Sequence, residues 1–273
     1  MKIDLHTHTY YSDGVLSPTE LVQRAVEKGV DVLALTDHDT LMGIDEAILA
    51  AGPHSIKIIP GVEVSCLWRE QTIHMIGLNV DMTHQPLREK LDGVLKDRQE
   101  RAEQITKKLT KFGIPGVEEG IFRQVKGVPG RLHFARYLAD KGYAATPGKA
   151  FKQYMARGKP GYFKSEWMSL AEAATLIRDA GGIPVIAHPR RYDLTLKKIT
   201  SMLEEFKAAG GEGVEVATTN QNKSDQIIMA RLAMQLDLAM SIGSDFHEPC
   251  AYNELGKASF LVPVEGRLVS DLL

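Results

Sequence analysis

Nine residues of the types that bind divalent metal ions are spread along this chain, each beside a segment that we predict to be a β-strand. His6 and His8 are separated by one residue, and so are Asp245 and His247. Because side chains two positions apart on a strand point to the same side, each pair could reach a single ion. The complete set, placed at the ends of the predicted strands, is His6, His8, Asp13, His38, Glu63, His74, His188, Asp245 and His247.

A metal centre explains this set better than nine separate coincidences do. A single histidine is more often a core or surface residue than a ligand, but a full series at successive strand ends is hard to produce by chance. The ligands are imidazoles and carboxylates, a mixture typical of catalytic sites for Mn²⁺, Zn²⁺ or Fe²⁺ rather than of structural zinc sites. Nine ligands are too many for one ion and suffice for three if a carboxylate bridges.

Clustered divalent ions favour hydrolysis of a phosphate ester. They lower the pKa of a bound water and neutralise charge on a phosphoryl oxygen. The sequence contains neither a Gly-x-Ser-x-Gly elbow nor a Walker-type loop. We therefore expect the nucleophile to be a metal-bound hydroxide, with the general acid left open.

Binding of phosphate also requires cations that are not metals, and arginine is the preferred planar partner. Two arginine-containing segments, 130–136 and 188–192, stand out. The strongest predicted phosphate-binding residues are Arg131 and Arg191, the second of which closely follows a predicted ligand. Weaker candidates for substrate binding are His133 and Arg136, and a surface position is the simpler interpretation of the latter.

The elements that must position these residues alternate between strands and helices. Ser17, Pro18 and Glu20 form the start of a helix with a capping box, and Gly29 ends it. Ser169 and Glu172 repeat the capping pattern near the C-terminal part. Further helices are predicted at 44–51, 196–209 and 225–236, and strands at 2–7, 30–36, 57–65, 72–80, 183–187, 213–217 and 238–244. This alternation predicts an α/β protein with a mainly parallel sheet, whose ligands lie at the C-terminal strand ends as in barrel enzymes.

The middle of the chain breaks this rhythm and has a different charge. Residues 84–164 contain 18 Lys and Arg against 8 Asp and Glu, a net +10, whereas the remainder contains 15 against 27, a net −12. We predict a barrel domain formed by 1–83 and 165–273, with 84–164 as a basic, mainly helical insertion. A polyanionic substrate would suit this arrangement. We predict one long, charged helix at 87–112, for which a solvated helix with internal ion pairs is the favoured interpretation, but this does not explain the excess of positive charge from 123 to 164.

The composition is that of a soluble globular protein, with 44% hydrophobic and 25% charged residues over 273 positions. Only Cys66 and Cys250 are present, which favours a reducing compartment over a disulfide scaffold. The first residues lead directly into a predicted strand without a signal-peptide pattern, and no apolar run reaches membrane-spanning length. We therefore expect a cytoplasmic protein without a membrane partner.

Taken together, the motifs resemble those of the PHP (polymerase and histidinol phosphatase) family of metal-dependent phosphoesterases. The resemblance spans nearly the whole chain and rests on His6-x-His8, Tyr11-Ser12-Asp13-Gly14, Thr36-Asp37-His38-Asp39, Gly61-Val62-Glu63, His74, His188-Pro189 and Ser244-Asp245-x-His247. Within the family, the segments 131–136 and 154–162 resemble the bacterial ribonuclease AM group, which includes 3′,5′-nucleoside bisphosphate phosphatases.

The resemblance implies a distorted (β/α)7 barrel with three divalent ions, usually Mn²⁺, with Zn²⁺, Fe²⁺ and Mg²⁺ as alternatives. By analogy, one ion would be bound by His6, His8, Glu63 and Asp245. A second would be bound by Glu63, His74 and His188, and a third by Asp13, His38 and His247. One departure is Arg190, which stands where similar proteins often have glycine, and it leaves the position of Arg191 open.

The activity implied is hydrolysis of 3′,5′-nucleoside bisphosphates, releasing the 3′-phosphate, and 5′→3′ exonuclease action on short 5′-phosphorylated RNA. The expected partner is a nucleotide or a short oligoribonucleotide, and we expect no attached polymerase. One alternative is a histidinol-phosphate phosphatase, which the basic insertion disfavours. Another is a non-catalytic metal-binding PHP module, but such modules usually lack ligands and none is missing here.

Overall fold

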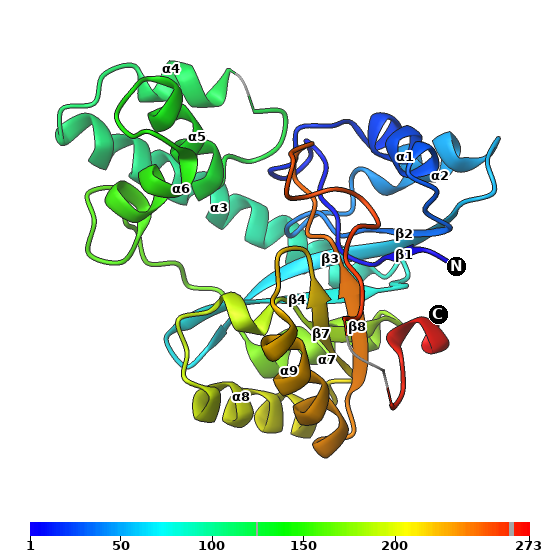
Figure 1. Cartoon of the computed structure of the whole chain (residues 1–273). Coiled ribbons are helices and arrows are strands. Elements are labelled where there is room, and N and C mark those ends of the chain that lie inside the picture. Colours follow the sequence, from blue (N-terminus) through cyan, green and yellow to red (C-terminus); the bar gives the residue numbers. More distant parts are fainter. Residues whose placement is uncertain (124, 262–264) are drawn as a thin grey trace.

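The protein has an α/β architecture in which helices surround a nearly closed, barrel-shaped sheet, with a separate group of helices to one side (Figure 1). The computed structural model describes residues 1–123, 125–261 and 265–273. In that part of the chain, no helix combines the length and apolar character that crossing a membrane requires. The barrel and the group of helices both contribute residues to the site described below.

The barrel is a single sheet whose strands follow the order β1-β2-β3-β4-β6-β7-β8. Its edges approach each other where the Leu5 amide donates to the Ile242 carbonyl at 3.1 Å. A short additional strand, β5 (Met168–Ser169), pairs with β3. The barrel strands are β1 (Ile3–Asp4), β2 (Val32–Leu35), β3 (Lys57–Trp68), β4 (Gln71–Leu78), β6 (Ile183–Ile186), β7 (Gly213–Thr218) and β8 (Ala239–Gly243). This topology confirms the expected distorted barrel.

One pair of strands departs from the parallel arrangement. β3 and β4 form an antiparallel hairpin in which Trp68 pairs with Gln71, and β4 is also antiparallel to β6. Two intervening residues close a hairpin but are too few for the crossover that parallel strands need. As a result, Glu63 and His74 lie inside long strands, and Asp13 lies in a turn well after β1, so the prediction that all nine residues stand at strand ends was wrong for these three.

The helices outside the barrel begin where the sequence predicts them. The Ser17 hydroxyl accepts from the Glu20 amide at 3.1 Å and the Glu20 carboxylate accepts from the Ser17 amide at 2.8 Å. Ser169 and Glu172 make the same reciprocal cap at a second helix. Both capping boxes are therefore confirmed. The outer helices are α1 (Pro18–Glu27), α2 (Ile44–Ala51), α7 (Leu170–Asp179), α8 (Leu196–Ala208) and α9 (Lys223–Gln235).

The helical lobe between β4 and β5 has its own apolar core. Its elements are α3 (Gln85–Lys111), α4 (Val117–Phe122), α5 (Arg131–Asp140), α6 (Pro147–Ala150) and a π-helical turn at Phe151–Met155. Buried residues from α3, α4 and α5 pack together, separately from the barrel clusters. Figure 1 shows α3 running from the barrel to the shorter helices of the lobe. The domain boundaries at 84 and 164 remain a prediction.

A further apolar cluster fills the barrel interior. It combines Leu5, Ala34, Ile59, Ile76 and Val185, which come from neighbouring strands and are at most 1% exposed. Close packing of this kind gives the strand ends a rigid base. Polar side chains that follow in the same strands are thereby held at fixed positions.

Candidate metal centre

Glu63 stands at the centre of the site. Its carboxylate lies next to five imidazoles, and it is fully buried in β3. Such an arrangement places one carboxylate where it could bridge neighbouring ions. The nitrogen–oxygen distances are 3.3 Å to His6, 3.3 Å to His8, 2.9 Å to His38, 3.1 Å to His74 and 3.1 Å to His188.

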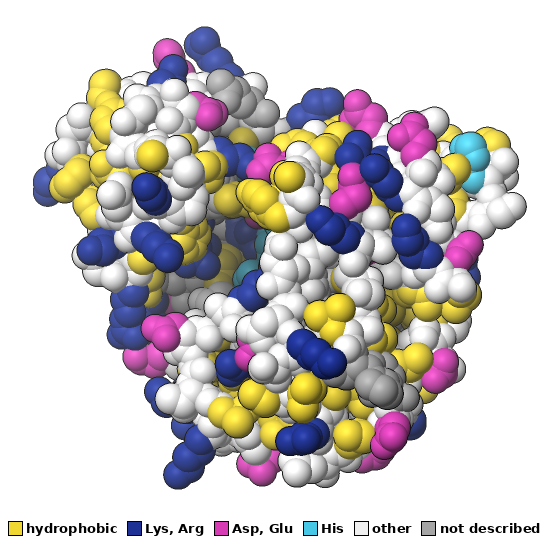
Figure 2. Space-filling model, viewed as in Figure 1, with side chains coloured by type: hydrophobic (Ala, Val, Ile, Leu, Met, Phe, Trp, Pro, Cys, Tyr) yellow, Lys and Arg dark blue, Asp and Glu magenta, His cyan; other side chains and the backbone are white. Residues whose placement is uncertain are grey.

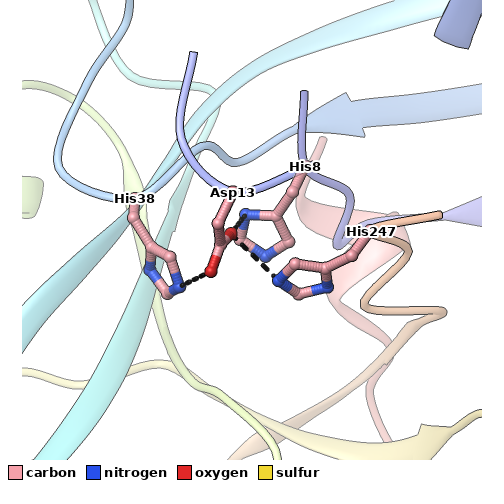
Figure 3. Close-up of side chains that lie close together, drawn as sticks. All are labelled: His8, Asp13, His38 and His247. Carbon is pink, nitrogen blue, oxygen red and sulfur yellow. Dashed lines mark ion pairs between the residues drawn. The ribbon is translucent and has the colours of Figure 1, made fainter. Parts of the chain in front are cut away.

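Asp13 forms a second centre, shown in Figure 3. Its carboxylate lies 3.0 Å from His247 Nε2 and 3.8 Å from His38 Nε2. His8 Nδ1 lies 3.9 Å from the same carboxylate, so this ring faces both centres. Asp245 completes the set, with its Oδ1 3.1 Å from His8 Nε2. All nine residues predicted from the sequence therefore lie together.

The backbone explains how the two His/Asp pairs meet. The segments after β1 and β8 run side by side, with the Asp245 amide donating to the His6 carbonyl at 2.8 Å and the His8 amide donating to the Phe246 carbonyl at 2.9 Å. Both segments are buried, and alternation directs His6 and His8 inward together. The spacing thus brings His6 and His8 into one group of candidate ligand atoms, whereas Asp245 faces His8 and the Nε2 atom of His247 faces Asp13.

Three non-glycine residues at the site adopt the left-handed backbone region. The φ angles are 54° for Asp39, 29° for His188 and 52° for Asp245. Such conformations cost about 1–3 kcal/mol each and persist where the surrounding structure enforces them. His188 and Asp245 follow β6 and β8, and the turns aim their side chains across the strand ends.

Glycine is required next to Asp13. A Cβ on Gly14 would lie 2.4 Å from the His8 carbonyl oxygen, so no other residue fits without moving the chain. The same loop is held by Asp37, whose carboxylate accepts from the Thr9 amide at 2.7 Å and from the Ser12 hydroxyl at 2.5 Å. These contacts position Asp13.

Glu215 is a supporting residue that the sequence analysis missed. This buried carboxylate in β7 lies 3.0 Å from His6 Nδ1 and accepts from the His188 amide at 2.6 Å. Proton donation from Nδ1 of His6 would fix its tautomer and leave Nε2 for an ion. A charged residue within the apolar segment 213–218 was the available signal.

Mutual attraction shifts the pKa values of the clustered groups. Although burial alone would raise them, neighbouring histidines hold the pKa values of Glu63, Asp13 and Asp245 well below the usual carboxylate range. Burial alone would lower the pKa of His8, but contacts with Asp245 and Glu63 raise it to about 10. The carboxylates are therefore negatively charged at neutral pH, as metal ligands must be.

His74 and His188 have hydrogen-bond geometry toward one oxygen of Glu63, but other contacts in the cluster fit a metal ion better than a direct hydrogen bond. His38 Nδ1 and Glu63 Oε2 are 2.9 Å apart, yet neither buried atom has a hydrogen-bond partner. Asp13 Oδ1 is also buried without a partner. Ligands bound at about 2.1 Å to one ion lie roughly 3–3.5 Å apart, which matches the separations here. The donor set, imidazole plus carboxylate, fits divalent cations.

The ligand atoms fall into overlapping groups. Three groups have all their ligand atoms within 4.8 Å of one another. Two of them share Glu63, as expected for a bridge, while His8 and His38 each belong to two groups. The assignment of ligands to individual ions given above remains a prediction. The groups are His8, Asp13, His38 and His247; His6, His8 and Glu63; and His38, Glu63 and His74.

The predicted arginines lie around this centre in different settings. Arg191 follows β6 in a 3₁₀ turn (Pro189–Arg191) and forms an ion pair with Asp245. Arg190, at the position of the usual glycine, has a normal backbone and donates to Asp225 of α9 at 2.7 Å. The substitution is therefore accommodated, and Arg191 remains beside the site.

The helical lobe reaches the centre through α5. Arg136 donates to the Asp13 carbonyl at 2.7 Å, so it is not a free surface residue. His133 accepts from the Gly130 amide at 3.0 Å, and burial lowers its pKa to about 4. Both residues line a cavity of about 660 Å³ between the lobe and α1. Their roles in substrate binding remain predictions.

A second bridge from the lobe was not foreseen. Arg98 of α3 donates to Asp39 at 2.6 Å and to the Ser65 hydroxyl at 2.8 Å, and its side chain is nearly buried. Asp39 follows His38 directly, and Ser65 is two residues from Glu63. α3 is therefore more than a solvated helix, because it contacts the two segments that carry the candidate ligands His38 and Glu63.

Comparison with known proteins gives consistent results. A family model described as the PHP domain matches residues 4–100. The chain is 47% identical to a 5′-3′ exoribonuclease of Haemophilus influenzae over 96% of this chain and 95% of that protein. It is 41% identical to a 3′,5′-nucleoside bisphosphate phosphatase of Chromobacterium violaceum, over 90% and 87%.

A solved structure shares the complete fold. An amidohydrolase from Chromobacterium violaceum, determined with bound sulfate and no metal, superimposes with a TM-score of 0.95. The two proteins are 39% identical, and the alignment covers 100% of this chain and 95% of that one. The helical lobe is therefore part of the shared architecture.

Proposed function

The chain belongs to the PHP family, and from this membership we propose that it is a metal-dependent phosphoesterase acting on nucleotides. Its proposed substrates are 3′,5′-nucleoside bisphosphates, from which it releases the 3′-phosphate, and short 5′-phosphorylated RNA, which it degrades from the 5′ end. The observation that carries the proposal is the cluster of nine candidate ligands, in which five histidines surround the buried carboxylate of Glu63. The names of the two relatives support the substrate class.

We further propose three divalent ions, with Mn²⁺ favoured. One would be held by His6, His8, Glu63 and Asp245, a second by Glu63, His74 and His188, and a third by Asp13, His38 and His247. Bound there, such ions lower the pKa of water and neutralise charge on the phosphoryl oxygens. The overlap of the ligand groups at Glu63 supports a bridged cluster.

The chain's own residues would bind and orient the phosphate. Arg191 pairs with Asp245 through one nitrogen and is 43% exposed, so further guanidinium N–H groups remain to bind a substrate oxygen. Glu215 would hold His6 and the His188 turn in place while a substrate binds and leaves. Neutralising the negative charge of the phosphate and holding it in a fixed position would both lower the activation barrier of hydrolysis.

The charge distribution supports a substrate with more than one phosphate. Figure 2 shows a hollow between the helical lobe and the barrel, with Lys and Arg side chains along the lobe and a histidine visible inside. The segment 84–164 carries a net +10. The sulfate in the related structure supports oxyanion binding by this fold. A small monoester such as histidinol phosphate would not use the lobe.

A substrate panel tests this proposal. Release of inorganic phosphate should be measured with adenosine 3′,5′-bisphosphate, adenosine 3′-monophosphate and histidinol phosphate, and shortening should be followed with a 5′-phosphorylated RNA oligomer. We expect the highest kcat/KM for the bisphosphate or the RNA, with an advantage that shrinks as salt rises. A clear preference for histidinol phosphate would overturn the proposal.

A further inference from the structure

Where α3 approaches the segment before β5, three buried hydrogen-bond donors have no acceptor within residues 1–123, 125–261 and 265–273. They are Arg101 Nε, Trp167 Nε1 and the Ser165 hydroxyl. Buried polar groups in proteins are nearly always paired, so each exception calls for an explanation. Two of these groups, the guanidinium and the indole, can only donate. What these buried groups lack is therefore hydrogen-bond acceptor atoms.

Three arginines gather around the same place. The guanidinium carbons of Arg98 and Arg101 lie 5.4 and 5.5 Å from the centroid of Trp167. Arg98 Nη1 also lies 3.8 Å from where a Cβ on Gly130 would stand, and Arg131 is the next residue. Arg131 itself stacks on Phe151 at 5.1 Å. α3, the start of α5 and the segment before β5 thus bring positive charge together.

The positive charge of this arginine cluster is only partly neutralised. Arg98 pairs with Asp39, but within residues 1–123, 125–261 and 265–273 neither Arg101 nor Arg131 forms an ion pair. Burial, followed by repulsion from Arg131 and Arg98, lowers the pKa of Arg101 to about 9. The ring of Trp167 attracts the faces of two guanidiniums, but it offers no acceptor to their N–H groups. A bound anion would supply both the missing charge and the missing acceptors.

We propose that Arg101, Arg131 and the indole N–H of Trp167 bind the phosphate group of the substrate that is not hydrolysed. For a 3′,5′-bisphosphate this is the 5′-phosphate, and for 5′-phosphorylated RNA it is the 5′-terminal phosphate. The proposal rests on the function proposed above and assigns one subsite within it. Arg101 and Arg131 are partly exposed, so a ligand from solvent can reach their side chains.

Arg98 links this anion subsite to the metal centre. Its guanidinium contacts the Trp167 ring on one side and Asp39 and Ser65 on the other. Because Asp39 follows His38, the subsite and the ligand cluster share one continuous set of contacts. Arg98 is therefore a positioning residue, while Arg101 and Arg131 supply the binding charge.

Two substrates that differ only in the 5′-phosphate distinguish binding of that phosphate from a general effect on hydrolysis. With Arg101→Met, kcat/KM for adenosine 3′,5′-bisphosphate should fall about 10–100-fold, the effect of losing a charged hydrogen bond, while adenosine 3′-monophosphate should change less than about threefold. Trp167→Phe keeps an aromatic ring but removes the indole N–H. This variant should lower kcat/KM several-fold for the bisphosphate only. The matched control is Arg88→Met, which removes an exposed charge from the same helix and should spare both substrates.

An equal loss on both substrates, or no loss on either, would overturn the subsite. Circular dichroism and thermal unfolding of each variant check that the fold is intact. If Arg101→Met does not fold, the selective effect of Trp167→Phe decides.

Binding to metal-depleted protein provides a readout independent of hydrolysis. Calorimetry in the presence of EDTA should show that adenosine 5′-monophosphate binds more tightly than adenosine, and that Arg101→Met removes most of this difference. Equal binding of the two ligands by the unaltered protein would overturn the subsite even if bisphosphates are hydrolysed. If binding of adenosine 5′-monophosphate depends on Arg101 but the protein does not hydrolyse bisphosphates, the anion subsite stands and the proposed substrate is refuted.

Discussion

One buried carboxylate organises the candidate metal centre. Glu63 lies within 3.3 Å of nitrogens from five histidines, while Asp13 and Asp245 flank it. Neighbouring histidines keep all three carboxyl pKa values low, so the carboxylates are ready to bind cations at neutral pH. Protons compete with metal ions for the same imidazoles, so metal affinity should weaken as the pH falls.

The ligand types were readable in the sequence, whereas their supports were not. The pairs His6-x-His8 and Asp245-x-His247 could be recognised from their spacing, because alternation along a strand is a local property of the sequence. Glu215 and Arg98 act through contacts between segments far apart in the chain. Such contacts depend on the folded arrangement and have no short-range signature.

Asp245→Asn tests a ligand with minimal change of shape. Loss of the charge should reduce the metal content and lower turnover by several orders of magnitude, while the fold remains. Asp179→Asn, an exposed change on α7, is the matched control. Near-normal turnover and metal content in the first variant would show that Asp245 is not a ligand.

Glu215→Gln tests the supporting shell. We expect metal affinity to fall about 10–100-fold, the typical effect of removing a carboxylate behind a ligating histidine. Excess Mn²⁺ should then restore much of the activity, which loss of a direct ligand would not permit. Glu204→Gln on the surface of α8 provides the control. Unchanged metal affinity would assign Glu215 a purely structural role.

Among the elements, the hairpin β3–β4 and the long helix α3 determine the site's unusual shape. The hairpin carries Glu63 and His74 in strand interiors. Arg98 of α3 donates a hydrogen bond to the Ser65 hydroxyl in the first strand of that hairpin. Helix caps at Ser17 and Ser169 were predictable because they depend on four adjacent residues. The antiparallel pairing was not inferred from the alternation of strands and helices, although the short gap between the predicted strands 57–65 and 72–80 is too small for a parallel crossover.

Arg98→Met should lower the free energy of unfolding, because it removes the ion pair between α3 and the barrel. The change leaves the buried carboxylate of Asp39 without its cation, which typically costs about 3–5 kcal/mol. Urea unfolding would measure the loss. The double variant with Asp39→Asn should recover part of it, because no buried charge then remains unpaired. A loss below about 1 kcal/mol for Arg98→Met would contradict the proposed brace.

A pH-dependent contact fastens α1 to the segment after β8. Arg24 donates to Glu254 at 2.6 Å; burial alone would raise the carboxyl pKa, but this contact lowers it to about 2. A lowered folded pKa gives stability that is present above the unfolded value near 4.5 and is lost as the pH falls toward 2. Because the pair is partly exposed, Glu254→Gln should cost about 1 kcal/mol at pH 7.

The difference between this variant and the parent protein should shrink as the pH falls toward 2, because the Glu254 carboxyl of the parent then becomes protonated in the folded as well as the unfolded state. Chemical denaturation across this range measures the difference, with the exposed change Asp179→Asn on α7 as the control. A difference that does not depend on pH would show that the contact is not electrostatic.

The molecule as a whole separates its charges. An acidic barrel carries the ligand cluster, and a basic lobe stands over the hollow beside it (Figure 2). This division was visible in the sequence because charge can be counted without knowing the fold. How the lobe docks was not, since it depends on single contacts such as Arg136 to the Asp13 carbonyl. A substrate held between the two parts would meet cations on both sides.

Removal and return of metal during hydrolysis of adenosine 3′,5′-bisphosphate tests the proposed chemistry most directly. Protein depleted with a chelator should release no phosphate, and activity should return with added Mn²⁺ and reach its maximum near three bound ions per chain. Elemental analysis of the same samples would give the ion count. Full activity in protein that contains almost no metal would contradict a metal-dependent phosphoesterase built on these nine residues.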